Sequence, residues 1–208
     1  MDRTLICFCQ HYLNSMDFPE NSLRAPGRSG SVEVIAGCMF SGKTEELIRR
    51  LRRAQLAGLR VEIFKPAVDN RYSETRIVSH DDRSIISTPV DNASSILLLT
   101  GEVDVIGIDE AQFFDSSLAD VCNTLADSGV RVVVAGLDMD YLGKPFGIMP
   151  EIMAIAEYVT KVHAICMRCG NLAHYSHRKS DEPGVVLIGS GNLYEPLCRG
   201  CYNKATQK

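Results

Sequence analysis

The sequence predicts an α/β protein built on a parallel β-sheet that helices cover on both faces. Stretches rich in Val and Ile alternate with stretches whose apolar residues recur at helical spacing. The Val/Ile stretches are nearly continuous, as expected for parallel strands buried on both faces. Hydrophobic residues make up 45% of the 208 residues, which is enough for a sizeable core. These observations favour one medium-sized domain with a small appendage.

The first strand is predicted to follow an N-terminal extension. Residues 1–30 end in NSLRAPGRSG, which is rich in Pro, Gly and Ser, so we expect a flexible segment without a catalytic role. The strand itself is predicted at 32–36, VEVIA. A helix is expected over 43–57 because apolar residues there have helical spacing, and Gly58 is a suitable stop.

The remaining strands and helices are predicted from the same kinds of sequence pattern. A second strand is predicted at 61–65, then a hairpin over 77–87 with the polar sequence HDDR at its tip. The later Val/Ile-rich stretches predict further strands, at 103–109, 130–138 and 158–165. Helical stretches are expected between these strands, at 91–100, 115–128 and 150–157. We expect this α/β domain to span 31–162 and a small C-terminal domain to span 163–208.

The charge and hydropathy of the chain exclude some classes of protein. The formal net charge is −4 and the pI is about 5.7, which disfavours a duplex-binding protein. No apolar run approaches the roughly 20 residues that a membrane span needs. The N-terminal sequence MDRTLICFCQHYL does not resemble a secretory signal, so we expect a cytoplasmic protein. The basic run RRLRR at 49–53 is interpreted as a solvated helix face rather than a nucleic-acid site.

A phosphate-binding loop (P-loop) is predicted between the first strand and the first helix. The sequence GCMFSGKT at 37–44 matches G-x-x-x-x-G-K-[ST] in the strand–helix context that the motif requires. Its glycines let backbone N–H groups approach phosphate oxygens, and the helix N-terminus adds partial positive charge. The predicted phosphate-binding residues are Gly37, Cys38, Met39, Phe40, Ser41, Gly42, Lys43 and Thr44.

Two adjacent carboxylates complete the predicted phosphate-transfer site. The sequence VIGIDEAQFF at 105–114 places Asp109 and Glu110 directly after a predicted strand. P-loop proteins need an acidic residue at the end of a neighbouring strand to hold Mg²⁺, together with the loop Thr44. Glu110 would then orient and deprotonate the group that attacks the γ-phosphate. The motif permits either a water or a substrate hydroxyl as that group.

Four of the eight cysteines form two C-x-x-C pairs. The pairs are CMRC at 166–169 and CRGC at 198–201, separated by the 28 residues 170–197. Two such turns complete a tetrahedral zinc site with no open position, so we expect structural Zn²⁺ on Cys166, Cys169, Cys198 and Cys201. Redox dithiols and an iron–sulfur cluster are the alternatives. We call residues 170–197 the lasso; it either covers a ligand pocket or is a plain zinc-ribbon hairpin.

Six motifs, taken in order, resemble the cytosolic, zinc-containing thymidine kinase family. They run from about Gly30 to Cys201, and residues 1–30 have no counterpart. The motifs are GCMFSGKT, KPAVDNRYSE with VSHDDR, DEAQFF, GLDMDYLGKPFG, CMRCGNLAHYSHR and VVLIGSGNLYEPLCRGC. The resemblance implies a recombinase-type, P-loop NTPase-like sheet with a zinc-ribbon lasso domain. It also implies transfer of the ATP γ-phosphoryl group to the 5′-hydroxyl of thymidine.

The resemblance further implies roles for individual residues. Glu110 would be the general base, Asp109, Thr44 and Asp69 would serve Mg²⁺, and Arg71 would help Lys43 neutralise the phosphates. Tyr141 stands where many relatives have Phe. The implied thymidine-binding residues are Met39, Phe113, Leu137, Tyr141, Phe146, Ser176, Leu187, Ile188, Gly189, Ser190 and Tyr194. Phe114 is more simply a core residue.

The family resemblance also implies partners, and two other classes compete with it. Family members are commonly homotetramers inhibited by dTTP, with ATP and thymidine as substrates. No nucleic-acid or membrane partner is expected. A P-loop ATPase would use Glu110 to activate water, but it leaves the lasso unexplained. A zinc-ribbon nucleic-acid binder would need a basic ribbon, but basic and acidic residues are nearly balanced there: Arg168, Arg178, Lys179 and Arg199 against Asp181, Glu182 and Glu195.

Overall fold

A six-stranded sheet with every pairing parallel forms the centre of the protein. The computed structural model describes residues 30–67, 76–78, 84–179 and 193–206. The strand order is β5-β2-β6-β7-β1-β8. The strands, in chain order, are β1 (Ser31–Gly37), β2 (Val61–Pro66), β5 (Thr88–Val90), β6 (Val105–Ile108), β7 (Arg131–Leu137) and β8 (Tyr158–Val162). The parallel α/β fold predicted from the Val/Ile stretches is therefore confirmed.

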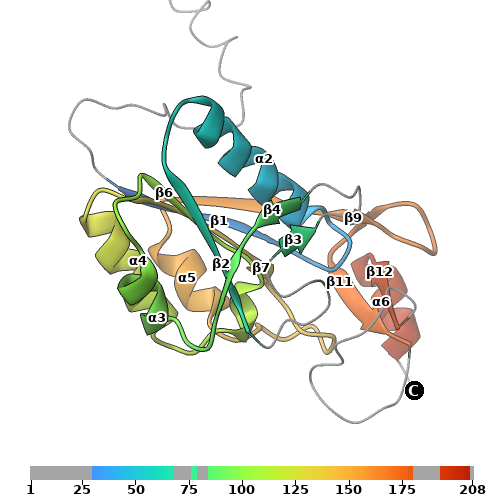
Figure 1. The fold of residues 1–208 in the computed structure, drawn as a ribbon. Helices are drawn as coiled ribbons and strands as arrows, with labels where there is room; N and C mark the ends of the chain where they lie inside the picture. The colour runs from blue at the N-terminus through green and yellow to red at the C-terminus, as the bar shows by residue number, and fades with distance from the viewer. Residues whose placement is uncertain (1–29, 68–75, 79–83, 180–192, 207–208) are drawn as a thin grey trace, which may run out of the picture.

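Helices cover the two faces of this sheet unequally (Figure 1). Helix α2 (Lys43–Leu56) lies on one face and packs on the sheet with Leu47, Ile48 and Leu51. Three shorter helices lie on the other face and pack on the sheet through the larger core. These are α3 (Ser94–Leu99), α4 (Leu118–Asp127) and α5 (Met149–Ile155).

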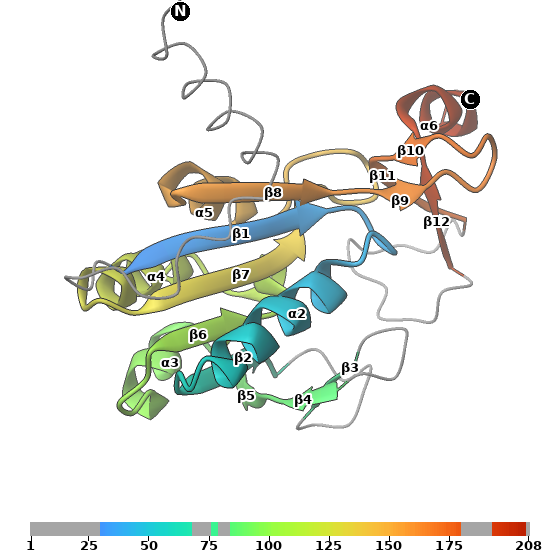
Figure 2. The ribbon, with the colours of Figure 1, turned by 90° about the horizontal axis from the view of Figure 1, so that it is seen from above.

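A small C-terminal unit lies beyond the ends toward which the sheet strands point (Figure 2). Strands β9 (Ala164–Ile165) and β10 (Leu172–Ala173) pair antiparallel, as do β11 (Tyr175–Arg178) and β12 (Tyr194–Leu197). Helix α6 (Arg199–Thr206) follows β12. These elements share a third core that includes Ala173, Leu197 and Tyr202, and the side chain of Cys38 from the P-loop joins it.

Most predicted elements exist, with small shifts at their ends. The predicted strand 158–165 is wrong in one respect, since it breaks at His163 into β8 of the main sheet and β9 of the small one. The predicted hairpin is confirmed as β3 (Arg76–Val78) and β4 (Ser84–Ile86), while its HDDR tip lies outside the described residues. The edge strand β5 and helix α6 had no counterpart among the predictions, because both are too short to show a clear period.

A buried ion cluster joins α2 to the sheet. Glu33 on β1 accepts hydrogen bonds from Arg50 at 2.9 Å and from Arg131 at 2.6 Å. Arg50 also bonds Glu46 at 2.8 Å and the Thr160 hydroxyl at 2.9 Å. The interpretation of the RRLRR run as a solvated face is therefore wrong for Arg50, which is only 6% exposed. The Arg50 guanidinium thus contacts one carboxylate on β1 and one on α2 itself, as its several donors allow.

We predict that Glu33→Ala lowers the free energy of unfolding by about 3–5 kcal/mol, because it leaves two arginines without their buried carboxylate. Urea unfolding measures this change. Glu102→Ala is the matched control, since Glu102 is 91% exposed and pairs with Arg60 at the surface. Its loss should have little effect. A Glu33→Ala protein no less stable than Glu102→Ala would contradict the importance of the cluster.

Candidate functional site

The P-loop connects β1 to α2 and makes a tight turn. Gly37 has no room for a side chain, because a Cβ there would lie 2.3 Å from the Val162 carbonyl oxygen. Gly42 has φ +82°, a left-handed conformation that glycine adopts without strain. Helix α2 then begins at Lys43 without a side-chain cap, so its first N–H groups remain directed toward the loop. The geometry is that of an anion-binding turn.

Side chains of the loop hold its own backbone in place. Lys43 Nζ donates to the Cys38 carbonyl at 2.9 Å, and the Ser41 hydroxyl donates to the same oxygen at 2.8 Å. The Cys38 thiol points the other way, toward the Ala173 carbonyl at 3.4 Å. Burial raises the pKa of this thiol, so it stays protonated at neutral pH. Cys38 therefore serves packing through its side chain and offers only its backbone to the loop.

Asp109 and Thr44 meet at the C-terminal end of β6. The Thr44 hydroxyl donates to Asp109 Oδ2 at 3.3 Å, although 65 residues separate the two in sequence. Asp109 is 6% exposed, and its Oδ1 accepts the Glu110 N–H at 3.0 Å. A hydroxyl and a buried carboxylate this close are hard oxygen donors of the kind that Mg²⁺ prefers. The structure thus brings together two of the three residues predicted to serve magnesium.

Glu110 is held in an unusual backbone conformation. Its φ of 50° and ψ of 42° are left-handed, which is uncommon for a residue with a side chain. Its carboxylate accepts a hydrogen bond from Gln112 Nε2 at 2.5 Å, and Gln112 Oε1 accepts the Leu137 N–H at 2.9 Å. Such outliers concentrate at functional sites. The sequence prediction identified Glu110 but not its partner Gln112.

Two of the predicted aromatic residues touch each other beside this carboxylate. The rings of Phe113 and Phe146 pack edge to face with centroids 5.9 Å apart. Phe146 is held by its N–H, which donates to the Asp138 carbonyl at 3.1 Å. The neighbouring Phe114 is buried in the large core, as predicted for it. Of the two adjacent phenylalanines, Phe113 therefore packs against Phe146, and Phe114 belongs to the core.

The C-terminal unit contacts the P-loop and the segment after β7. Ser176 is buried, and its hydroxyl accepts the Met39 N–H at 3.0 Å. The Arg178 guanidinium lies 3.7 Å from the centre of the Tyr141 ring, a cation–π arrangement. The Tyr202 hydroxyl donates to the Tyr141 carbonyl at 2.8 Å. Predicted residues from both halves of the chain, Met39, Tyr141 and Ser176, therefore lie along one boundary.

Several predicted site residues fall outside this geometry. Tyr194 is described, and it is buried on β12 opposite Arg178. Some predicted residues lie outside the described part of the chain, namely Asp69, Arg71, Leu187, Ile188, Gly189 and Ser190. Their roles stay predictions.

The sequence prediction missed three contacts near the predicted residues. Gln112 bridges Glu110 and β7, Arg178 covers Tyr141, and Asp138 is a buried carboxylate paired with Lys161 at 2.7 Å. The only sequence signal for Gln112 was its place two residues after the carboxylate pair. No signal marked Arg178 or Asp138, because their partners, Tyr141 and Lys161, come from other parts of the chain.

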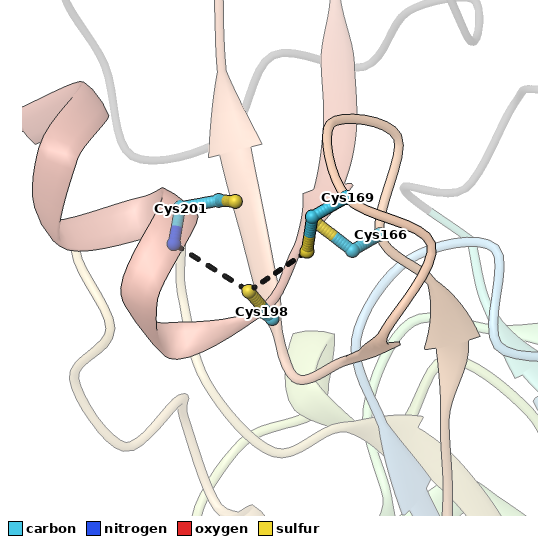
Figure 3. Close-up of side chains that lie close together, drawn as sticks. All are labelled: Cys166, Cys169, Cys198 and Cys201. Atoms are coloured by element: carbon cyan, nitrogen blue, oxygen red, sulfur yellow. Dashed lines mark hydrogen bonds between the residues drawn. The ribbon is translucent and has the colours of Figure 1, made fainter.

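The four paired cysteines converge in the C-terminal unit (Figure 3). Their sulfur atoms all lie within 4.8 Å of one another, and the Cys169 and Cys198 sulfurs are 3.5 Å apart. A tetrahedral zinc ion with bonds of about 2.3 Å would hold its sulfurs about 3.8 Å apart. Among the described residues this is the one cluster of such donors, and it could hold a metal ion.

The ionisation of the cluster supports a cation at its centre. Removal from water opposes ionisation of Cys166, but backbone N–H groups outweigh it and lower the pKa to about 6. Hydrogen bonding to Cys169 and Cys198 raises the pKa of Cys201 to about 12. Without a metal, Cys166 therefore ionises more readily than Cys201, and four adjacent thiolates would repel one another. A divalent cation removes that repulsion and lets all four ionise.

These features define an α/β P-loop protein of the nucleotide-binding class with an appendage whose four cysteines could hold a metal ion. Among the described residues, none of the helices has the length and apolar character to cross a bilayer.

A family model described as thymidine kinase matches residues 30–202, and the chain therefore belongs to the thymidine kinase family. It is 61% identical over 191 residues to the thymidine kinase of Bacteroides fragilis, covering 92% of this chain and 96% of that one. It is 61% identical over 180 residues to that of a Rhodothermus species, covering 86% and 84%. It is 59% identical over 192 residues to that of Porphyromonas gingivalis, covering 92% and 94%.

We predict about one zinc atom per chain, and a sharp loss of zinc in Cys198→Ser. Metal content should fall at acid pH, because protons then compete with the metal for the four thiolates. Cys122→Ala is the control and should keep its zinc, since Cys122 is buried in α4 away from the cluster. Elemental analysis measures the metal. Iron, or a fully active protein without metal, would contradict the zinc assignment.

Proposed function

We propose that this chain transfers the γ-phosphoryl group of ATP to the 5′-hydroxyl of thymidine, giving ADP and dTMP. One observation carries the proposal within the thymidine kinase family. Glu110 follows Asp109 at the end of β6, and Asp109 contacts Thr44 of the P-loop. In a P-loop protein, the acidic residue near the loop helps to hold Mg²⁺. The carboxylate that follows it, here Glu110, lies where the attacking group must approach the γ-phosphate.

The P-loop would bind the triphosphate of ATP. Its backbone N–H groups, together with the N-terminus of α2, favour the oxygens of the phosphates. Lys43 would exchange its hydrogen bond with the Cys38 carbonyl for the β- and γ-phosphates, and Arg71 would add a second positive charge. The proposed phosphate-binding set is Gly37, Cys38, Met39, Phe40, Ser41, Gly42, Lys43, Thr44 and Arg71.

Magnesium would be held at the same edge of the sheet. We assign it to Thr44, Asp109 and Asp69, of which the first two are in contact at 3.3 Å. When bound with ATP, Mg²⁺ would neutralise charge that develops on the phosphate oxygens. Asp109 is buried and tied to the Glu110 N–H at 3.0 Å, so its carboxylate is fixed for this purpose.

Glu110 would act as the general base on the 5′-hydroxyl. A carboxylate is too weak a base to ionise an alcohol in the ground state, so the proton would move late, as the phosphoryl group transfers. The hydrogen bond from Gln112 and the left-handed backbone fix the position of the carboxylate. Orienting the hydroxyl toward the phosphorus is then part of the same role.

Apolar and aromatic side chains around the ends of β7 and β1 would hold the nucleoside. Phe113 and Phe146 form a right-angled pair that offers a flat wall to a pyrimidine. Tyr141 is steadied by Arg178 and by Tyr202. The proposed thymidine-binding set is Met39, Phe113, Leu137, Tyr141, Phe146, Ser176, Leu187, Ile188, Gly189, Ser190 and Tyr194.

The wider proposal concerns the metal, the domains and the assembly. The four-cysteine cluster would hold structural Zn²⁺ and close the lasso at its base, because every ligand position is a thiolate. The P-loop domain would span 31–162, the lasso domain 163–208, and residues 1–30 would be an extension. The proposal also includes homotetramer formation and feedback inhibition by dTTP, which rest on the family resemblance, and a cytoplasmic location.

Lys43→Ala should lower kcat by about 10³-fold, because it removes the positive charge that faces the developing phosphate charge. A coupled ADP assay with thymidine measures the rate. Lys204→Ala, an exposed lysine near the end of α6, is the control and should leave the rate unchanged. Near-normal turnover by Lys43→Ala would remove the P-loop from the mechanism. ADP formation that does not need thymidine would indicate an ATPase.

Glu110→Gln should lower the single-turnover rate by about 10²- to 10⁴-fold, the usual contribution of a positioned general base. ATP and thymidine should still bind, since the P-loop and the aromatic wall are unchanged. Asp109→Asn should instead raise the Mg²⁺ concentration needed for half-maximal activity. The base assignment fails if Glu110→Gln keeps its rate within about threefold, and the magnesium assignment fails if the Mg²⁺ dependence of Asp109→Asn is unaltered.

A further inference from the structure

A single buried amide connects the proposed base to the strand beside the nucleoside wall. Gln112 is 3% exposed and lies in the short helix η1 (Ala111–Phe113) that follows Glu110. Its Nε2 donates to Glu110 Oε2 at 2.5 Å, and its Oε1 accepts the Leu137 N–H at 2.9 Å. The two hydrogen bonds use the nitrogen and the oxygen of the same amide group, and together they connect the end of β6 to the end of β7.

The direction of the amide follows from its partners. A backbone N–H can only donate, so the oxygen of Gln112 must face Leu137. The NH₂ group is thereby turned toward Glu110, where it meets an oxygen that must accept. A hydrogen bond to an ionised acceptor is shorter and stronger than one between neutral groups. Leu137 thus sets the orientation of the amide, and the amide sets the position of the carboxylate.

The packing around Gln112 leaves it little freedom to move. A Cβ on Gly147, which has φ +52°, would lie 2.4 Å from the Gln112 carbonyl oxygen. A Cβ on Gly136 would lie 3.0 Å from Gln112 Oε1 and 2.5 Å from the Met149 sulfur. Gly136 on β7 thus allows close packing on the Gln112 side chain, and Gly147, before α5, allows close packing on its backbone. Tight packing of this kind fixes a side chain in one conformation.

We infer that Gln112 is the positioning residue for the proposed base, and that it couples the base to the wall that receives the nucleoside. The inference rests on the proposed role of Glu110. Leu137 ends β7, and Phe146 lies in the segment that follows it. The Phe146 ring contacts the ring of Phe113, which follows Gln112 in the sequence. Gln112 therefore supports both the Glu110 carboxylate and the nucleoside wall, and this fixes the distance between the base and the bound 5′-hydroxyl.

Two variants separate this role from simple stability. Gln112→Met keeps the length of the side chain but loses both hydrogen bonds. Gln112→Glu keeps an acceptor for Leu137, so it preserves the structural bond if Gln112→Met fails to fold. The control is Gln55→Met, the same chemical change at an exposed position of α2. It should behave like the wild type in every measurement.

The expected result for Gln112→Met is a kcat lower by about 10- to 100-fold, the rate equivalent of losing one charge-assisted hydrogen bond. The KM for thymidine should change by less than about threefold, because no proposed contact to the nucleoside is removed. A purely structural role would instead lower the amount of folded enzyme while leaving kcat per active site unaltered. Active-site titration with thermal unfolding separates the two.

Gln112→Glu should give a distinctive pH profile. Two carboxylates this close do not ionise together readily, so over a range of pH they share one proton. In that range the protonated Glu at 112 can donate to Glu110 as the amide did, and kcat should approach the wild-type value. At higher pH both ionise and repel, so kcat should fall where the wild-type rate is level. A wild-type-shaped profile would overturn the inference.

The decisive test combines the two sites. If Gln112 acts through Glu110, adding Gln112→Met to Glu110→Gln should lower kcat no further, within about threefold. If the two losses multiply, Gln112 does not work through the base and the inference is wrong. If Glu110→Gln alone is nearly as active as the wild type, the proposed base fails, whatever Gln112 does. The two failures are therefore distinguishable.

Discussion

The contact between the P-loop and the C-terminal unit is the constraint on which the arrangement of the site depends. Met39 donates its N–H to the buried Ser176 hydroxyl at 3.0 Å, and the Cys38 side chain belongs to the core of the C-terminal unit. The loop cannot move without disturbing that core. Cys166 belongs to the same core, so the cysteine cluster and the P-loop are connected through one set of packed side chains.

The parallel sheet supplies the second half of the site through its strand ends. Parallel strands end at a common edge, which brings Asp109 of the β6 end within reach of Thr44 on α2. The buried cluster of Glu33, Arg50 and Arg131 fixes α2 against β1 and β7. Because α2 begins at the P-loop, this cluster also helps to set where the loop lies. The chemistry therefore rests on a helix whose position is determined by buried charge as well as by apolar packing.

The sequence predicted a local feature well where few other structures need the same combination of residue types. Glycines at 37 and 42 with Lys43 and Thr44 identified the P-loop, because few other turns need that combination. The paired cysteines identified the four-cysteine cluster for the same reason. The break at His163 was not predicted, because β8 and β9 are both extended and apolar and only pairing with different sheets separates them. Arg50 looked like its exposed neighbours, since its partner Glu33 is 17 residues away.

By itself the sequence determined the class of fold, the P-loop, the carboxylate pair and the four clustered cysteines, since each depends on residue type and short spacing. Tertiary structure alone decided which of these groups touch and how they are held. The bond from Gln112 to Leu137 spans 25 residues, and that from Met39 to Ser176 spans 137. No local pattern encodes such pairs. They form only when the packing of the sheet and of the C-terminal unit brings a donor and an acceptor to the same buried place.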